Sequence, residues 1–175
     1  MDVVSDEHTA VAATNDFFVA GAENGSVTKY SLLTNSMEEI LVRCTLPIHD
    51  IALSPDGRWA AVASGELEVK VVNTSDMTRV MYLREQTKAP KHVSFDVSGT
   101  VLAVSCTDGA VYLYSLSSVE PSLIKKLDGL VKPLEGDAEA SSQVAWHPDG
   151  RAFAVPTGSR GECCDLACSR ADSSA

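Results

Sequence analysis

The stretch "SPDGRWAAVAS", residues 54–64, combines a tight turn with a short strand of small residues. Asp56 and Gly57 mark the turn, because glycine readily adopts the positive φ that hairpin turns need. The small apolar residues that follow predict a buried strand. Two similar stretches occur later, "DVSGTVLAVSC" at 96–106 and "HPDGRAFAVPT" at 147–157. The chain therefore repeats one turn-and-strand unit.

The repeat has a period of 42 residues. Gly57 and Gly99 are 42 positions apart, and the third copy, at Gly150, arrives nine positions late. An extra polar segment between 128 and 142, "DGLVKPLEGDAEASS", accounts for the delay. Other residues share the spacing: Val27, Val69 and Val111, and, at twice the period, Gly25 and Gly109, with Leu67 at the midpoint. Several marks with one period indicate a genuine internal repeat.

Each repeat is predicted to be an antiparallel meander. In one repeat the strands are expected around 51–53, 59–63, 69–72 and 79–83, and in the next around 93–95, 101–104, 111–114 and 122–127. The segment "SMEEILVRC" is assigned to the outer strand by its place in the period. Asp-Gly and Asn-Gly pairs supply the positive φ that two-residue hairpins need, so such hairpins are predicted between the strands. Four strands in about 42 residues are typical of a WD40 propeller blade.

The predicted fold is therefore all-β, a partial WD40-type β-propeller of about three and a half four-stranded blades. The incomplete propeller is expected over residues 1–157, and an unrelated, disordered tail is expected at 158–175. The repeats are expected at about 7–44, 49–83, 91–127 and 142–157. Small residues in the second strand predict close packing between blades: Gly21, Ala60, Ala61, Ala103 and Ala154. A plain β-sandwich would not require the repeat.

The signature residues of WD40 repeats are largely absent. Tyr30-Ser31, Val72-Asn73 and Tyr114-Ser115 stand where a Trp-Asp pair would end the third strand. The Gly-His pair is also missing, although His49, His92 and His147 lie near the second strand or its turn. We therefore expect the buried hydrogen-bond network of a standard WD40 repeat to be incomplete.

Composition excludes several classes of function. The net charge of −10 and the pI near 4.7 argue against a surface that coats nucleic-acid phosphates. No apolar run reaches the roughly 20 residues of a membrane span, and the first residues do not read as a signal peptide. A cytosolic or nuclear protein is expected. Lysines are scattered among acids: Lys88, Lys91, Lys125, Lys126 and Lys132.

Cysteine spacing gives no metal site. Cys44 and Cys106 lie in or beside apolar segments and are predicted to be buried hydrophobic residues. Cys163, Cys164 and Cys168 crowd the end of the chain without the paired CxxC spacing of zinc ligands.

No catalytic, cofactor or metal residue is predicted. His49, Asp50 and Ser54 have the side chains of a catalytic triad, but neighbours in a strand point to opposite faces. His147 precedes a proline in a turn, where a surface or capping role is expected, and no glycine-rich loop with a following lysine suggests a phosphate site. Glu66, Glu68 and the acidic stretch 135–139 are interpreted as solvated loop residues.

Whole phrases of the chain resemble a known family. "LVRCTLPIHDIALSPDGRWAAVASGELEVKVVNTSDMTRVMYLREQ", "KHVSFDVSGTVLAVSCTDGAVYLYSLSS" and "VAWHPDGRAFAVPT" are similar to the N-terminal WD40 domain of the replisome adaptor family. Its fungal members are called minichromosome loss protein or SepB. The animal relative is the acidic nucleoplasmic DNA-binding protein with WD repeats and an HMG box. The resemblance runs from about Asp6 to Thr157.

The resemblance implies a nuclear, non-enzymatic scaffold of the replication fork. In the full-length family it implies links between the replicative helicase and DNA polymerase α-primase, association with chromatin, and roles in sister-chromatid cohesion and genome stability. It implies protein partners, with no cofactor, membrane or small-molecule substrate and no sequence-specific DNA binding by this segment. Alternatives are another intracellular scaffold, such as the WD40-like subunit of the anaphase-promoting complex, a propeller hydrolase, or a nonfunctional truncated product.

The chain also departs from the family pattern. A family propeller of about seven blades would continue after residue 157, whereas here "GSRGECCDLACSRADSSA" follows. We expect a truncated product whose isolated blades expose apolar faces and self-associate, because repeat arrays need caps at their ends.

Overall fold

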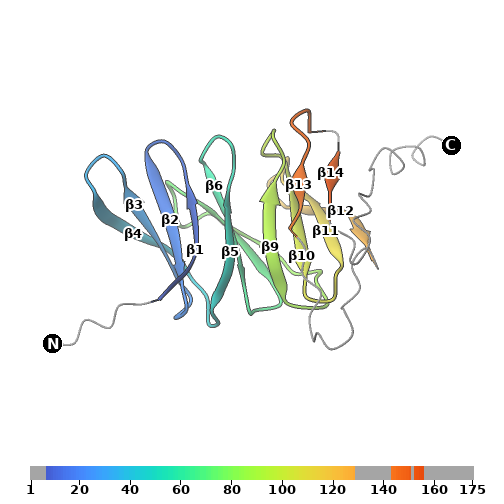
Figure 1. The fold of residues 1–175 in the computed structure, drawn as a ribbon. Coiled ribbons are helices and arrows are strands. Elements are labelled where there is room, and N and C mark those ends of the chain that lie inside the picture. The colour runs from blue at the N-terminus through green and yellow to red at the C-terminus, as the bar shows by residue number, and fades with distance from the viewer. Residues whose placement is uncertain (1–6, 129–142, 151, 156–175) are drawn as a thin grey trace.

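Antiparallel β-sheets make up the fold of this chain. The structure, a computed structural model, describes residues 7–128, 143–150 and 152–155. The described residues form three four-stranded sheets and one two-stranded sheet, and they contain no helix. They therefore contain no helix that could cross a membrane. In Figure 1 the sheets follow one another in chain order, from the blue sheet to the orange one.

Each four-stranded sheet is a simple meander, which we call a blade. Blade 1 contains β1 His8–Ala13, β2 Phe17–Ala22, β3 Ser26–Ser31 and β4 Ser36–Arg43. Blade 2 contains β5 Ile48–Leu53, β6 Trp59–Ser64, β7 Val69–Asn73 and β8 Val80–Leu83. Blade 3 contains β9 Pro90–Phe95, β10 Val101–Cys106, β11 Val111–Ser115 and β12 Ser122–Leu127. The β-pair of blade 4 is β13 Ala145–Trp146 with β14 Phe153–Ala154.

These strands confirm the predicted meanders, including the outer strand β4. The first and last sheets lie at opposite ends of the row in Figure 1, so the described blades form an open, partial propeller. The proposed repeat boundaries remain predictions. The tail at 158–175, most of the segment 128–142 and the last three cysteines lie outside the described residues.

The prediction of two-residue hairpins is wrong for the turn that contains Gly57. Ser54 donates its N–H to the Trp59 carbonyl at 2.8 Å, which closes a loop of four residues. Gly57 has a φ of 69° and donates to the Ser54 carbonyl at 2.8 Å. The hydroxyl of Ser54 donates to Asp56 and accepts from the Trp59 N–H, so side chains stabilise the longer loop. Gly99 and Gly150 hold the same place, with φ of 70° and 69°.

The second turn of blade 2 differs from its counterparts. Gly25 and Gly109 have φ of 80° and 78° and close three-residue loops in blades 1 and 3. Leu67 stands at the matching position of blade 2 but is absent from the described residues with positive φ. Leucine strongly disfavours that conformation, so this loop takes another path.

The hydrophobic core lies between the blades rather than within one sheet. Blades 1 and 2 bury Val19, Val27, Ile48, Ile51 and Val62 against each other. Blades 2 and 3 form the largest cluster, and blade 3 packs on the β-pair of blade 4 through a smaller one. Burial of these faces supplies the main stabilisation of the fold, because a single twisted sheet exposes two faces to water.

Small residues allow this close packing, as predicted. Ala60, Ala61 and Ala103 are fully buried between blades, whereas Ala154 is half-buried. Gly21 is the tightest point, because a Cβ there would lie 2.5 Å from Cγ2 of Ile48 in blade 2. A larger side chain at position 21 would therefore push blades 1 and 2 apart.

Polar side chains also connect the innermost strands of successive blades. Thr9 on β1 donates its hydroxyl to the Ile48 carbonyl on β5 at 2.6 Å. The Nδ1 of His49 on β5 lies 3.0 Å from the Pro90 carbonyl on β9. Thr9 and His49 both occupy bulges in their strands, and Ile48 and Pro90 are 42 positions apart. The side chain at each bulge thus contacts the start of the inner strand of the next blade.

Candidate functional site

The three side chains of a catalytic triad do not assemble. The carboxylate of Asp50 accepts hydrogen bonds from the backbone N–H of Ile51 at 2.9 Å and of Val93 at 3.0 Å. His49 contacts a backbone carbonyl of blade 3, and the hydroxyl of Ser54 donates to Asp56 at 2.6 Å. Each group therefore has a structural partner in the blade joint or the turn.

Other residues considered for chemistry also have structural roles. His147 accepts the N–H of Asp149 in an exposed turn, as expected of a capping residue. Cys44 and Cys106 are free and buried, as predicted, and burial raises the pKa of both thiols, that of Cys106 to about 12. Over the described residues, no group of three His, Cys, Asp or Glu side chains could hold a metal ion.

The interpretation of Glu66 and Glu68 as solvated loop residues is wrong. Only 14% of the Glu66 side chain and 23% of the Glu68 side chain are exposed. The Glu66 carboxylate lies 2.8 Å from Nζ of Lys70 and accepts both the N–H and the hydroxyl of Thr45 at 2.7 Å. Lys70 also donates to the Arg43 carbonyl at 3.2 Å. The group ties the loop of blade 2 to the end of blade 1.

The pKa of Glu66 reflects these contacts. Burial by itself would raise the pKa of this carboxyl, but hydrogen bonds from Lys70 and Thr45 outweigh burial and lower the pKa to about 2. Glu66 is therefore ionised in the folded protein at neutral pH and acts as a structural anion.

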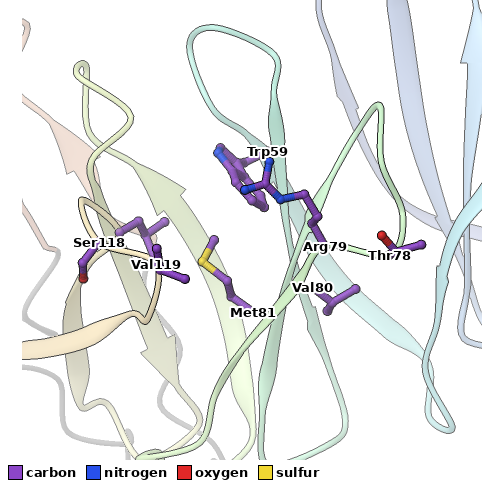
Figure 2. A pocket seen from close by; sticks show the side chains of 8 residues that line it. Trp59, Thr78, Arg79, Val80, Met81, Ser118 and Val119 are labelled. Carbon is purple, nitrogen blue, oxygen red and sulfur yellow. The ribbon is translucent and has the colours of Figure 1, made fainter.

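A hollow among the described residues lies at the rim between blades 2 and 3. This cleft, of about 400 Å³, is lined by Trp59, Thr78, Arg79, Val80, Met81, Leu116, Ser118 and Val119, and we call it the Trp59 cleft. Blade 2 contributes the start of β6, the β7–β8 turn and β8, and the β11–β12 turn of blade 3 contributes the opposite wall. Figure 2 shows Trp59 and Met81 on one side and Val119 on the other, with Arg79 reaching toward Trp59.

The corresponding space between blades 1 and 2 is filled. Lys29 on β3 crosses it, with Nζ 4.9 Å from the ring centre of Phe17 and 3.1 Å from the Glu38 carboxylate. The same Nζ donates to the Thr74 carbonyl at 3.2 Å. Phe17 and Trp59 are 42 positions apart, as are Lys29 and Val71. Val71 is too short to cross the rim, so the Trp59 cleft stays open.

Sequence reasoning did not find this cleft. It placed Trp59 at the start of a buried strand and gave no role to Arg79, Met81 or Val119. The only signal was the replacement of Lys29 by Val71 in the next repeat, and its meaning requires knowing what Lys29 contacts.

Comparison with known proteins finds several curated relatives, three of which are described here. No family model matches the chain. The chain is 37% identical over 155 residues to minichromosome loss protein 1 of Schizosaccharomyces pombe, a match that covers 89% of this chain and 19% of that protein. It is 27% identical over 161 residues to WD repeat and HMG-box DNA-binding protein 1 of Xenopus laevis, covering 89% and 14%. It is 23% identical over 185 residues to the DNA polymerase alpha-binding protein of Saccharomyces cerevisiae, covering 82% and 20%.

A solved structure shares the fold. The Cps50 (Swd1) β-propeller domain of Myceliophteria thermophila superposes with a TM-score of 0.72 at 16% identity, over 87% of this chain and 50% of that chain. The comparisons confirm the predicted partial WD40 propeller and the resemblance to the replisome adaptors. The chain spans a fifth or less of the length of these three curated relatives.

Proposed function

We propose that this chain, a partial WD40 propeller of the replisome adaptor family that includes minichromosome loss protein 1, is a non-enzymatic protein-interaction scaffold of the nuclear replication fork. The observation that carries the proposal is the 37% identity to that protein over 89% of the chain. Because the match covers most of the chain, the blade faces and the rim would have been inherited together.

The scaffold role also agrees with the chemistry of the described residues. The polar groups at the blade joints are engaged in hydrogen bonds between blades, as for His49 and Asp50. A catalytic group needs a side chain free to reach a substrate. A propeller of this kind instead offers loops and rims on a rigid frame, which are suited to binding other proteins.

The proposed partners follow from the relatives. One relative is named for binding DNA polymerase alpha, and another for binding DNA and carrying an HMG box. We extend the first of these properties to this chain as a hypothesis, with the replicative helicase as the second partner that the family resemblance implies. With a net charge of −10, the chain would reach chromatin through bound proteins rather than through DNA phosphates.

The proposal is tested by isolating proteins on newly made DNA. Cells that express the tagged 175-residue chain are pulse-labelled with a thymidine analogue and crosslinked. The labelled DNA is then captured with the proteins bound to it. We expect the chain to be enriched on pulse-labelled DNA and depleted after a chase into unlabelled medium. Equal recovery before and after the chase, or no recovery, would contradict a role at the fork.

A further inference from the structure

We propose that the Trp59 cleft binds a short peptide segment of a partner protein in which an acidic residue adjoins a large apolar one. This inference rests on the proposed scaffold function and names the chemistry of one partner segment. The cleft has about 400 Å³, a size that suits one or two side chains of a bound segment.

The walls of the cleft are apolar where a side chain would enter. The Trp59 indole, Met81 and Leu116 are only partly buried, and they pack on the cluster between blades 2 and 3. Val119 stands on the opposite wall with 93% of its surface exposed. An apolar side chain placed between Val119 and Trp59 would remove both from water, which favours binding.

Arg79 supplies the charge that selects an acidic residue. Its side chain is exposed and, within the described residues, makes no side-chain hydrogen bond or close ion pair, although the Asp76 carboxylate is near enough for the two charges to interact. The neighbouring carboxylate of Asp76 is occupied, because it accepts the hydroxyl of Thr78 at 2.6 Å and the N–H of Thr78 at 3.2 Å. The Arg79 fork therefore remains available for a carboxylate from a partner, which it can hold through two hydrogen bonds.

In the joint between blades 1 and 2, the position that matches the Trp59 cleft is filled by the protein's own side chains. There, Lys29 satisfies the Thr74 carbonyl, pairs with Glu38 and covers Phe17. In the joint between blades 2 and 3, Val71 and Met81 replace the pair formed by Lys29 and Glu39. The corresponding cation is Arg79 at the rim, and its acidic neighbour Asp76 is held by the hydroxyl of Thr78. A bound acidic segment would complete the arrangement.

The test uses peptides selected on the full 175-residue chain. A phage-displayed library of random 12-residue peptides is selected on the immobilised protein, and the enriched sequences are synthesised with a fluorescent label. We expect enriched sequences with Asp or Glu next to Leu, Ile, Phe or Met, bound with affinities measurable by fluorescence anisotropy. Because the chain has a net charge of −10, non-specific attraction would instead enrich basic peptides.

Four variants locate the binding. Arg79→Gln should weaken binding about tenfold or more, the loss expected for a charged hydrogen-bonded pair. Val119→Ser should weaken it about threefold to tenfold through lost apolar contact. The matched controls are Arg58→Gln, an exposed arginine of the neighbouring turn paired with Asp56, and Leu33→Ser, an exposed apolar residue of blade 1. Both controls should leave affinity unchanged.

Enrichment of basic or uncharged peptides, or equal affinity of Arg79→Gln and the unchanged chain, would overturn the inference. Peptide binding at the cleft without enrichment on nascent DNA would refute the proposed function and leave the inference standing. Enrichment on nascent DNA that Arg79→Gln and Val119→Ser leave intact, with no peptide bound, would refute the inference alone.

Discussion

Single residues decide how this chain departs from a regular repeat. Where blades 1 and 3 use a glycine with positive φ, blade 2 has Leu67, and its loop is held instead by Glu66. That carboxylate connects to Lys70 within the blade and to Thr45 at the end of blade 1. An ion pair and two hydrogen bonds thus replace a backbone conformation that leucine cannot readily adopt.

Glu66 should make stability depend on acid pH. Its carboxyl has a pKa of 4.5 when unfolded and about 2 when folded, so its contribution is complete above pH 4.5 and is lost as the pH falls from 4.5 toward 2. Glu66→Gln should lower the free energy of unfolding by about 2 kcal/mol at pH 7 and by much less near pH 2. Urea unfolding at both pH values measures this. The control is Glu23→Gln in the exposed hairpin of blade 1, and an equal loss at both pH values would contradict the prediction.

The two buried thiols should resist alkylation. Burial raises the pKa of Cys106 to about 12 and also raises that of Cys44, so little thiolate exists at pH 8. Iodoacetamide labelling followed by mass spectrometry of the separate peptides should find both unmodified in the folded chain and modified in urea. Labelling of Cys106 in the native protein at the denatured rate would show that blade 3 is not packed as described.

At the scale of the strand, the blades depend on small residues and on turns that approach each other. The turn glycines of successive blades lie against the preceding turn, since a Cβ at Gly99 would be 3.2 Å from Pro55 and one at Gly150 would be 2.8 Å from Val97. Gly21 has the same role deeper in the joint, against Ile48. The conformation of the turns and the spacing of the blades are therefore set together.

Gly21→Ala should destabilise the joint between blades 1 and 2. The added Cβ would overlap Ile48 in a closely packed region, with an expected cost of about 2 kcal/mol. Thermal and urea unfolding measure the loss. Ile48→Ala removes the side-chain atom nearest to the new methyl group, so the double variant should lose less stability than the sum of the two single variants. Simple additivity would mean that the two residues do not meet.

The strands could be predicted from sequence, but the Trp59 cleft could not. The 42-residue spacing of Gly57 and Gly99, with the small residues after each, fixes turn and strand together because both signals are local. The loop length could not be read, since the side chain of Ser54 stabilises a longer loop. The contacts of Glu66 could not be predicted, since its partner Thr45 lies 21 positions away. The cleft depends on the difference between Lys29, which fills the joint between blades 1 and 2, and Val71 at the matching position of blade 2. That difference has meaning only when neighbouring blades are seen together.

For the whole molecule, the open arrangement of blades leaves one sheet face without a described neighbour. Val19 and Val27 of blade 1 face blade 2, so the alternate rows of the sheet face away from it. Those rows carry exposed apolar side chains, with Val11 66%, Met37 57% and Ile40 37% exposed. Exposed apolar side chains on one sheet face favour association.

The purified chain should therefore self-associate as its concentration rises, as the sequence also predicts. Light scattering coupled to size-exclusion chromatography should show a mass that increases with protein concentration. Replacing Met37 with Glu and Ile40 with Lys should shift the chain toward the monomer, because charges on the face oppose its burial. Leu33→Lys, in the exposed turn of the same blade, should have no such effect. A sharp monomer peak at every concentration would contradict this view of the open face.

The central claim, that this propeller binds proteins of the replication fork, is tested most directly by crosslinking mass spectrometry. The tagged 175-residue chain is incubated with nuclear extract treated with nuclease, crosslinked and captured, beside Arg79→Gln and Arg58→Gln. We predict that the chain and Arg58→Gln capture replication proteins, DNA polymerase α among them, with crosslinks from acidic segments near the Trp59 cleft that Arg79→Gln loses. Recovery of no replication protein by any of the three would contradict the account.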